Sequence, residues 1–274
     1  MADTPTDALL NALTAWLNAL PAGGIGVAFS GGVDSTLLLA AAARSGRAIA
    51  ALTAHTALHS EAELQRAQEL AASLGVPLQL FRLNPLELPQ VRSNAVDRCY
   101  WCKRSLFLQM AEFAAEHGIT SLVDGSNADD ARVYRPGRRA LRELGVRSPL
   151  AELGFSKADI RRLSAALGLP TASAPAVPCL ATRFDYGTPL TDEALRRVQA
   201  GEEVLHRLLP AAADVRLRVH GDLARIEVPP AQFPAVQSCA APLTAALKEL
   251  GYLYITLDLE GFRSGSFDRA HHLS

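Results

Sequence analysis

The sequence predicts an α/β protein, with a parallel sheet covered by helices and a small α+β domain at its C-terminal end. Apolar runs of strand length alternate with helical segments from residue 24 to residue 170, which is the pattern of a parallel sheet. From about residue 192 the order changes to a helix, a strand pair, a helix and a strand. With 274 residues, of which 49% are hydrophobic, the chain can bury one large core or two modest ones.

Hydrophobic spacing predicts the elements of the first part in order. Residues 8–20 have apolar side chains at helical spacing and end at Pro21 and two glycines, so they form a helix. The elements expected after it are strands at 24–29, 47–55, 77–83 and from about 121, and helices at 36–46, 60–75, 100–117 and 156–170. In the last of these helices, Ser156 and Asp159 match the start of a capping box.

The second part begins after a stretch rich in Pro, Ala, Thr and Gly at residues 171–189, which predicts a loop and a domain junction. We expect a first domain at 1–188, which contains the parallel sheet, and a small α+β domain at 189–274. The elements expected in the second domain are a helix from about 192, a strand pair at 215–228, a helix at 233–251 and a strand at 252–259.

Composition excludes several classes of protein. Lys and Arg total 27 against 28 Asp and Glu, so no basic excess indicates a nucleic-acid partner. The N-terminal stretch lacks the pattern of a secretory signal, and no segment has the roughly 18 apolar residues of a membrane span. We therefore expect a soluble, cytoplasmic protein without a membrane partner. In a reducing compartment, the Cys-x-x-Cys pair in "RCYWCK" is more often metal-binding or redox-active than a disulfide.

A glycine-containing turn, "SGGVDS", joins the first predicted strand to the helix that follows. Gly31 and Gly32 let backbone amides approach phosphate oxygens, and the helix start adds unpaired N–H groups. Ser30 and Ser35 can donate from their hydroxyls, and Asp34 can hold Mg²⁺ against the phosphates. The string is not a Walker A loop, because no Gly-Lys-Ser/Thr follows. The alternative is a tight turn that uses glycine for geometry and serine for capping, but the full string in this context favours an anion site.

This loop resembles that of the pyrophosphatase-loop ATP enzymes, which adenylylate a carboxyl or carbonyl group and release pyrophosphate. Further strings, in order over nearly all of the chain, are similar to the LarE family of ATP-dependent sulfur transferases, which make the nickel-pincer cofactor of lactate racemase. They are "RCYWCKRSLF", "DGSNADD", "SPLAELGFSKADIR", "PCLATRFDYG", "RVHGDLARIEV" and "LDLEGFRSGS".

The resemblance implies a fold like that of the adenine nucleotide alpha hydrolases, and the use of ATP and Mg²⁺. It also implies that a carboxylate of a pyridinium-3,5-biscarboxylate mononucleotide is adenylylated and then converted to a thiocarboxylate. A homo-oligomer is expected, with a hexamer as its form. The sequence does not identify the sulfur donor.

A second string after a strand matches a family motif near the active site through Gly125, Ser126, Asn127 and Asp129. The resemblance implies that these residues take part in nucleotide binding together with the glycine loop. The alternative for the same string is a capped polar turn without a role in binding.

Three cysteines are candidate catalytic residues. By resemblance, Cys179 in "PCLATR" is the sulfur-bearing cysteine, which in single-cysteine members gives up its own sulfur and becomes dehydroalanine. This chain departs from those members in having Cys99 and Cys102, and three thiolates can hold a 4Fe-4S cluster with one iron left open for an extra sulfide. A zinc site and sacrificial chemistry at Cys179 stay as alternatives. We interpret Cys239, in a predicted helix, as structural.

Charged residues of the second part are candidates for substrate binding. Arg216 and Arg218 alternate along a predicted strand and share one face, which suits a substrate phosphate. The resemblance places Glu227 and Glu203 near the same pocket. The alternative is a solvated strand face.

Four residues near the cysteines are further candidates for a role in the site. Arg183 and Asp185 follow Cys179 closely enough to orient an acyl-adenylate. Tyr100 and Trp101 lie between the paired cysteines and could shield a cluster, although packing is the simpler explanation.

Other functions compete with this hypothesis. A tRNA thiolase would use the same loop and cluster but should carry a basic surface or an RNA-binding module. An ATP-dependent amide-forming synthetase would not need three cysteines. A non-catalytic nucleotide-binding domain would bind ATP without releasing pyrophosphate.

Overall fold

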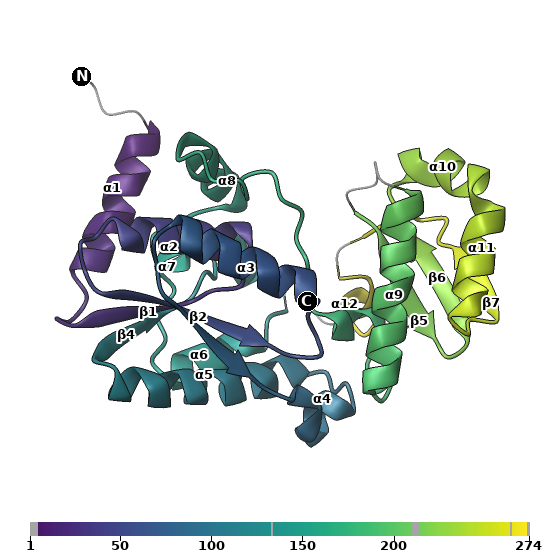
Figure 1. Cartoon of the computed structure of the whole chain (residues 1–274), viewed down its shortest axis with the longest axis horizontal. Coiled ribbons are helices and arrows are strands. Elements are labelled where there is room, and N and C mark those ends of the chain that lie inside the picture. The colour runs from purple at the N-terminus through teal and green to yellow at the C-terminus, as the bar shows by residue number, and fades with distance from the viewer. Residues whose placement is uncertain (1–4, 133, 210–213, 264, 273–274) are drawn as a thin grey trace. The chain divides into compact units, whose positions relative to one another are not determined.

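The chain forms two compact units (Figure 1). The computed structural model describes residues 5–132, 134–209, 214–263 and 265–272. The first unit contains residues 1–84 and 97–176, and the second contains residues 85–96 and 177–274. No helix in the described part of the chain is long and apolar enough to cross a membrane.

The first unit is built on a four-stranded parallel sheet with strand order β3-β2-β1-β4. Its strands are β1 (Gly24–Ala28), β2 (Ile49–His55), β3 (Leu78–Arg82) and β4 (Ile119–Val123). Each lies where the alternating pattern predicts it, and the α/β fold class is confirmed. Because all four strands run in one direction, the loops that follow β1 and β4 lie at the same edge of the sheet.

Helices cover both faces of this sheet (Figure 1). Helices α1, α2, α3 and α8 pack on one face, with a core that includes Leu17, Leu37, Val27 and Ile160. On the other face, the α5 and α6 helices cover Leu52 and its neighbours. The bounds in this unit are α1 (Pro5–Asn18), α2 (Val33–Ala43), α3 (Glu61–Ser73), α5 (Arg98–Glu116), η2 (Ala128–Arg132), α6 (Gly137–Glu143), α7 (Pro149–Glu152) and α8 (Lys157–Ala166).

The second unit is a three-stranded sheet with strand order β5-β6-β7, packed with helices. The predicted strand pair is confirmed as an antiparallel hairpin of β5 (Arg216–His220) and β6 (Leu223–Glu227), while β7 (Tyr254–Leu257) runs parallel to β6. The helices are η1 (Pro85–Glu87), α4 (Pro89–Arg92), η3 (Leu180–Arg183), α9 (Asp192–Leu208), η4 (Pro230–Gln232), α10 (Phe233–Ser238), α11 (Ala240–Glu249) and α12 (Ser266–Ala270).

The two units do not coincide with the predicted domains 1–188 and 189–274. The division falls after residue 176, and residues 85–96 group with the C-terminal part. Buried Asn94 explains this grouping, because its side chain donates to Phe184 O at 3.2 Å and Asp185 O at 2.9 Å. Gly187 N also donates to Asn94 O at 3.1 Å. Such long-range backbone contacts leave no periodic trace in a sequence.

The predicted helix at 233–251 is in fact two helices, which meet at Cys239. Pro242 has no N–H to donate and would clash with a carbonyl four residues earlier, so one continuous helix is disfavoured. Cys239 is half-buried and its thiol contacts Val236 O at 3.5 Å, a local contact that fits the structural role expected for it.

Candidate active site

The glycine loop lies between β1 and α2 and is held by its own serines. The Ser30 and Ser35 hydroxyls are 3.2 Å apart, Ser30 N donates to Ser35 Oγ at 3.3 Å, and Ser35 Oγ donates to Gly32 O at 3.2 Å. Gly31 has a φ of +70°, and a Cβ there would lie 3.2 Å from Ala67 Cα on α3. The N-cap residue of α2 is Gly32, which has no side chain to accept a hydrogen bond from the first amides of the helix. These amides can therefore donate to an anion in the loop.

The string after β4 meets this loop at the edge of the sheet. A Cβ on Gly125 would lie only 3.0 Å from Ser35 N, so the two backbones approach as closely as glycine allows. Asn127 Oδ1 accepts from Asp129 N at 3.0 Å and fixes the turn. The structure therefore brings together the two strings that the sequence predicted to bind nucleotide, although Asp34 and Asn127 are 93 residues apart along the chain.

Asp34, the predicted Mg²⁺ ligand, lies in the first turn of α2 between two polar partners. Its carboxylate accepts from Lys157 Nζ and, at 3.4 Å, from Asn127 Nδ2. Lys157 N donates in turn to Asp129 Oδ2 at 2.8 Å. Lys157 opens α8 directly after Ser156, whose capping box with Asp159 is confirmed. The sequence prediction missed this lysine, because the motif was explained by the cap alone.

A second lysine links the cysteine-bearing helix to the same edge. Buried Asp124, at the end of β4, accepts from Ser126 Oγ at 2.7 Å and from Ser148 Oγ at 2.5 Å. Lys103 Nζ lies 3.4 Å from Asp124 Oδ2 and follows Cys102 directly in α5. Lys103 is the second site residue that sequence reasoning missed, and its signal is its place directly after the cysteine pair.

Cys99 and Cys102 occupy the first turns of α5, three positions apart and so on one face of the helix. Cys99 is exposed and Cys102 is half-buried. Tyr100, between them, is buried and its hydroxyl donates to Glu143 at 2.7 Å, whereas Trp101 Nε1 donates to Asp97 at 2.9 Å. These contacts support packing as the role of both aromatic residues.

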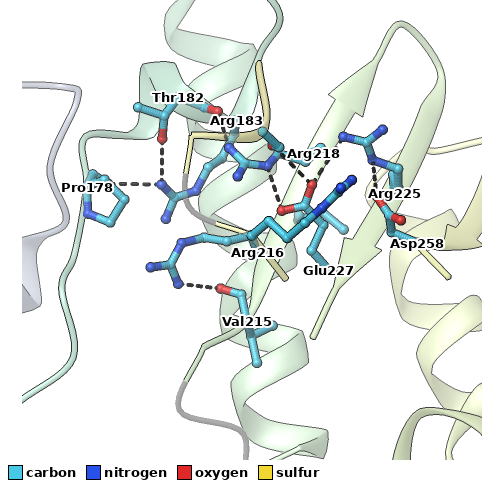
Figure 2. Close-up of polar contacts among 12 residues, drawn as sticks. Pro178, Thr182, Arg183, Val215, Arg216, Arg218, Arg225, Glu227 and Asp258 are labelled. Atoms are coloured by element: carbon cyan, nitrogen blue, oxygen red, sulfur yellow. Dashed lines mark hydrogen bonds and ion pairs between the residues drawn. The ribbon is translucent and has the colours of Figure 1, made fainter. Parts of the chain in front are cut away.

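In the second unit, Cys179 lies directly before the short helix η3 and begins a loop that Thr182 and Arg183 hold in place. Figure 2 shows the side chains of Thr182 and Arg183. Thr182 donates to Cys179 O from its backbone N at 3.0 Å and from its hydroxyl at 2.8 Å. Arg183 Nη1 donates to Pro178 O at 3.0 Å and to Thr182 Oγ1 at 2.9 Å. Arg183, predicted to orient an acyl-adenylate, therefore contacts the backbone before the cysteine and the side chain of Thr182 after it.

Arg183 pairs with Glu202, which directly precedes the predicted site residue Glu203. The Arg183 side chain is 2% exposed, and Nε and Nη2 each donate at 2.8 Å to the Glu202 carboxylate, which also accepts from Leu217 N at 2.9 Å. Glu203, the predicted residue, is exposed and accepts from Gln199 at 3.1 Å. On α9, position 202 continues the buried stripe of Leu195, Val198 and Leu205, and that periodicity could have identified Glu202.

Arg218 and Glu227, both predicted site residues, form a buried ion pair across the hairpin (Figure 2). Arg218 Nε lies 3.0 Å from Glu227 Oε2, and its Nη1 donates to Thr182 O in the cysteine loop. The other Glu227 oxygen accepts from Arg225 at 3.1 Å, and Arg225 Nε lies 3.5 Å from Asp258. Glu227 thus links arginines from both strands of the hairpin.

Burial makes this cluster electrostatically demanding. Arg216 is buried and donates to Val215 O at 2.7 Å; burial lowers the pKa of its guanidinium, and the positive charge of Arg183 lowers it further. Burial also lowers the pKa of Arg218, against the opposing effect of Glu227. The cationic forms therefore lose solvation that a bound anion could replace.

The cysteines that could bind a metal are divided between the two units. Within residues 5–132, 134–209, 214–263 and 265–272, no group of three or more His, Cys, Asp or Glu side chains is placed to hold a metal ion, and no two cysteines form a disulfide. Cys99 and Cys102 belong to the first unit and Cys179 to the second. The spacing of Cys99 and Cys102 on one helix face allows both thiolates to bind the same metal ion or cluster.

Comparisons with known proteins agree with this geometry. The sequence profile of the asparagine synthase family matches residues 22–133, which include the glycine loop and the string after β4. The solved structure of NMN synthetase from Francisella tularensis has a similar fold, with a TM-score of 0.53 at 20% identity over 64% of this chain and 76% of that chain. The fold and the loop thus define an ATP-using enzyme of the pyrophosphatase-loop class.

Two relatives align over most of their length. An uncharacterised protein of Synechocystis sp. is 42% identical over 89% of this chain and 91% of its own. The pyridinium-3,5-bisthiocarboxylic acid mononucleotide synthase of Lactiplantibacillus plantarum is 38% identical over 87% of each chain. The chain belongs to the LarE family of ATP-dependent sulfur transferases, as the motifs predicted.

Proposed function

We propose that this enzyme adenylylates a carboxylate of a pyridinium-3,5-biscarboxylate mononucleotide and replaces one carboxylate oxygen with sulfur, for nickel-pincer cofactor synthesis in the cytoplasm. The observation that carries the proposal is the arginine cluster around the Cys179 loop. Arg183 and Arg218 contact the loop backbone while Arg216 lies beside them on the same strand face as Arg218. A cysteine whose loop is held by cationic side chains suits a substrate that carries both a carboxylate and a phosphate.

In the first step, the residues of the sheet edge act on ATP. The amides of Gly31, Gly32 and the α2 start would bind phosphate oxygens, and Asp34 would hold Mg²⁺. Lys157 supplies a positive charge beside Asp34. The substrate carboxylate attacks the α-phosphorus, the bond to the β-phosphate breaks and pyrophosphate leaves. The product is an acyl-adenylate whose carbonyl carbon is open to a sulfur nucleophile.

In the second step, sulfur replaces AMP at that carbon. We propose Cys99, Cys102 and Cys179 as three ligands of a 4Fe-4S cluster, which when bound would present an open iron that carries an extra sulfide. The chain's own residues hold the thiols: α5 fixes the pair, and the Thr182 and Arg183 contacts fix Cys179. In the competing mechanism, the Cys179 thiolate attacks the acyl carbon, AMP leaves and a thioester forms. Loss of the Cys179 Cα proton to a base and cleavage of its Cβ–Sγ bond then release the thiocarboxylate and leave dehydroalanine after one turnover.

The test uses protein purified and reconstituted without oxygen. Pyrophosphate release that requires the mononucleotide, with thiocarboxylate formation by mass spectrometry, supports the function; ATP binding without pyrophosphate release contradicts it. For the cluster we expect about four irons and matching sulfide per chain, lost in Cys99→Ala/Cys102→Ala and retained in Cys239→Ala. Metal-free protein with dehydroalanine at position 179 would favour the single-turnover mechanism, and stoichiometric zinc would make the pair structural.

The proposed assembly is a homo-oligomer, with a hexamer as its form, in line with the family resemblance. Light scattering coupled to gel filtration tests it directly. A monomeric mass at micromolar concentration would contradict this part of the proposal.

A further inference from the structure

The C-terminal segment that follows β7 places an aromatic ring against each of the two alternating arginines of β5. The Arg216 guanidinium carbon lies 5.1 Å from the centre of the Phe262 ring. The corresponding carbon of Arg218 lies 5.3 Å from the ring centre of Phe267, and that of Arg225 lies 5.8 Å from the same ring. All three distances are within the range of a cation–π contact.

The first ring is positioned by the backbone. Phe262 N donates to Val228 O at 3.0 Å. Before it, Gly261 has a φ of +72°, and a Cβ at this position would lie 2.9 Å from both Val228 O and Pro230 Cδ. Only glycine fits this turn, so the entry of the segment is fixed.

The second ring is positioned by α12. Phe267 is 9% exposed, and Ser266 Oγ contacts Glu227 at 3.4 Å. Asp268 accepts from Tyr186 Oη at 2.6 Å, and His271 lies 2.7 Å from Asp185. Residues 185 and 186 follow the Cys179 loop directly, so α12 is tied to the same loop that the arginines hold.

A ring and a carboxylate hold a guanidinium in different ways. A carboxylate accepts hydrogen bonds from the N–H groups at the edge of the guanidinium, so these groups cannot donate to a ligand. An aromatic ring can contact the flat face of the guanidinium, and the N–H groups then remain able to donate to another acceptor. In this cluster Arg218 donates to Glu227 from Nε and to Thr182 O from Nη1, and Phe267 adds a cation–π contact. Such a combination orients a buried arginine without using all of its donors.

We propose that Phe262 and Phe267 are positioning residues, which orient Arg216, Arg218 and Arg225 toward the phosphate group of the mononucleotide. The inference rests on the proposed function, because it takes the substrate phosphate as the anion. Neither ring is a catalytic residue, since both act through the arginines.

The test compares Phe267→Leu, which keeps an apolar side chain of similar size, with Phe267→Tyr, which keeps the ring. We expect Phe267→Leu to raise KM for the mononucleotide about tenfold, in line with the loss of one or two partly buried cation–π contacts. KM for ATP should change less than twofold, and Phe267→Tyr should restore the mononucleotide KM. Phe113→Leu, in a half-buried ring that packs on Phe81 and His117, is the matched control.

A second measurement separates this inference from the proposed reaction. Calorimetry with inorganic phosphate, with the ATP loop filled by a non-hydrolysable ATP analogue, measures anion binding without turnover. Phosphate should bind about tenfold more weakly to Phe267→Leu than to the parent protein and Phe267→Tyr. If the parent protein binds phosphate but shows no turnover, the proposed function fails and the binding comparison still decides the inference.

Two results would overturn the inference. One is unchanged phosphate binding in Phe267→Leu. The other is an equal loss in Phe267→Leu and Phe267→Tyr, which would assign the ring to packing alone. Thermal unfolding checks that each variant is folded. If Phe267→Leu is not folded, Phe262→Leu, which removes the ring beside Arg216, takes its place.

Discussion

The ATP loop of the first unit and the arginine cluster of the second are built by opposite means. The loop uses backbone amides, glycines and half-exposed polar side chains at the edge of a sheet, and its charged pair of Asp34 and Lys157 keeps contact with solvent. The cluster uses buried ion pairs, in which Arg183, Arg218 and Glu227 are each 6% exposed or less. The structure of the first site therefore depends on backbone geometry, whereas that of the second depends on ion pairs that are shielded from solvent.

The contrast is sharpest at Glu202. Glu202→Gln would leave the buried Arg183 without its ionic partner, so we expect the free energy of unfolding to fall by about 3 kcal/mol. Urea denaturation followed by circular dichroism measures it. Glu203→Gln, one residue away on the exposed face of α9, is the control and should stay within about 0.5 kcal/mol of the parent. Equal values for the two variants would show that burial does not govern the cluster.

The loop should depend on space rather than charge. Gly31→Ala forces an unfavourable φ and a contact with Ala67, so we expect a loss of about 2 kcal/mol in unfolding free energy and a raised KM for ATP. Gly46→Ala has a similar φ of +74° but no atom within 4 Å of the new Cβ. It should cost about 1 kcal/mol and leave KM for ATP unchanged. A raised KM in both variants would mean that the contact is irrelevant.

Lys157 tests whether a half-exposed ion pair serves binding more than stability. For Lys157→Met we expect kcat/KM for ATP to fall about tenfold, which corresponds to about 1.4 kcal/mol in the transition state. The free energy of unfolding should change by less than about 1 kcal/mol, because the pair with Asp34 is partly solvated. Pyrophosphate release and urea denaturation measure the two quantities. Lys248→Met, on α11, is the control, and a larger effect on unfolding than on kcat/KM would assign Lys157 to stability.

The smallest effect is expected from a half-buried histidine of the first unit. Burial lowers the pKa of His59, and nearby His55 lowers it further while Glu63 opposes them. The unfolded chain therefore binds a proton more readily, so stability is lost as the pH falls below about 6.5, the unfolded pKa. His59→Asn, which can still pair with the Thr56 hydroxyl 3.0 Å away, should reduce this pH dependence by less than about 1 kcal/mol between pH 7.5 and 5.5. Parallel stability curves for variant and parent would refute it.

The same contrast explains how much the sequence predicts. The glycine loop and the string after β4 are local strings with a fixed relation to a strand, and the order of parallel strands brings their ends together. Lys157 and Lys103 were missed because each follows a residue with a sufficient explanation of its own, a helix cap in one case and a cysteine in the other. Their roles depend on which carboxylate the fold brings near, and no spacing in the sequence gives that.

For the cluster, the strand pattern predicted Arg216 and Arg218, because alternation places their side chains on one face, whereas Glu227 came from the family resemblance. To identify Glu202, the helical register of α9 had to be considered as well. The role of Arg183 could not be predicted, because the sequence does not show that its guanidinium is buried. The partners of a buried charged side chain depend on the tertiary structure. The sequence could therefore identify the candidate residues but not their ion-pair partners. The roles of the three cysteines stay a prediction for the same reason.

The insertion of residues 85–96 into the second unit has a consequence for dissecting the molecule. The chain passes from one unit to the other three times, after residues 84, 96 and 176. A protease cut at the last of these would leave residues 177–274 attached through Asn94 and the backbone contact of Leu190 N with Arg92 O at 2.7 Å. The two fragments would then behave as halves of a complemented protein and elute together, whereas a gene fragment that starts at residue 177 would lack part of its own core.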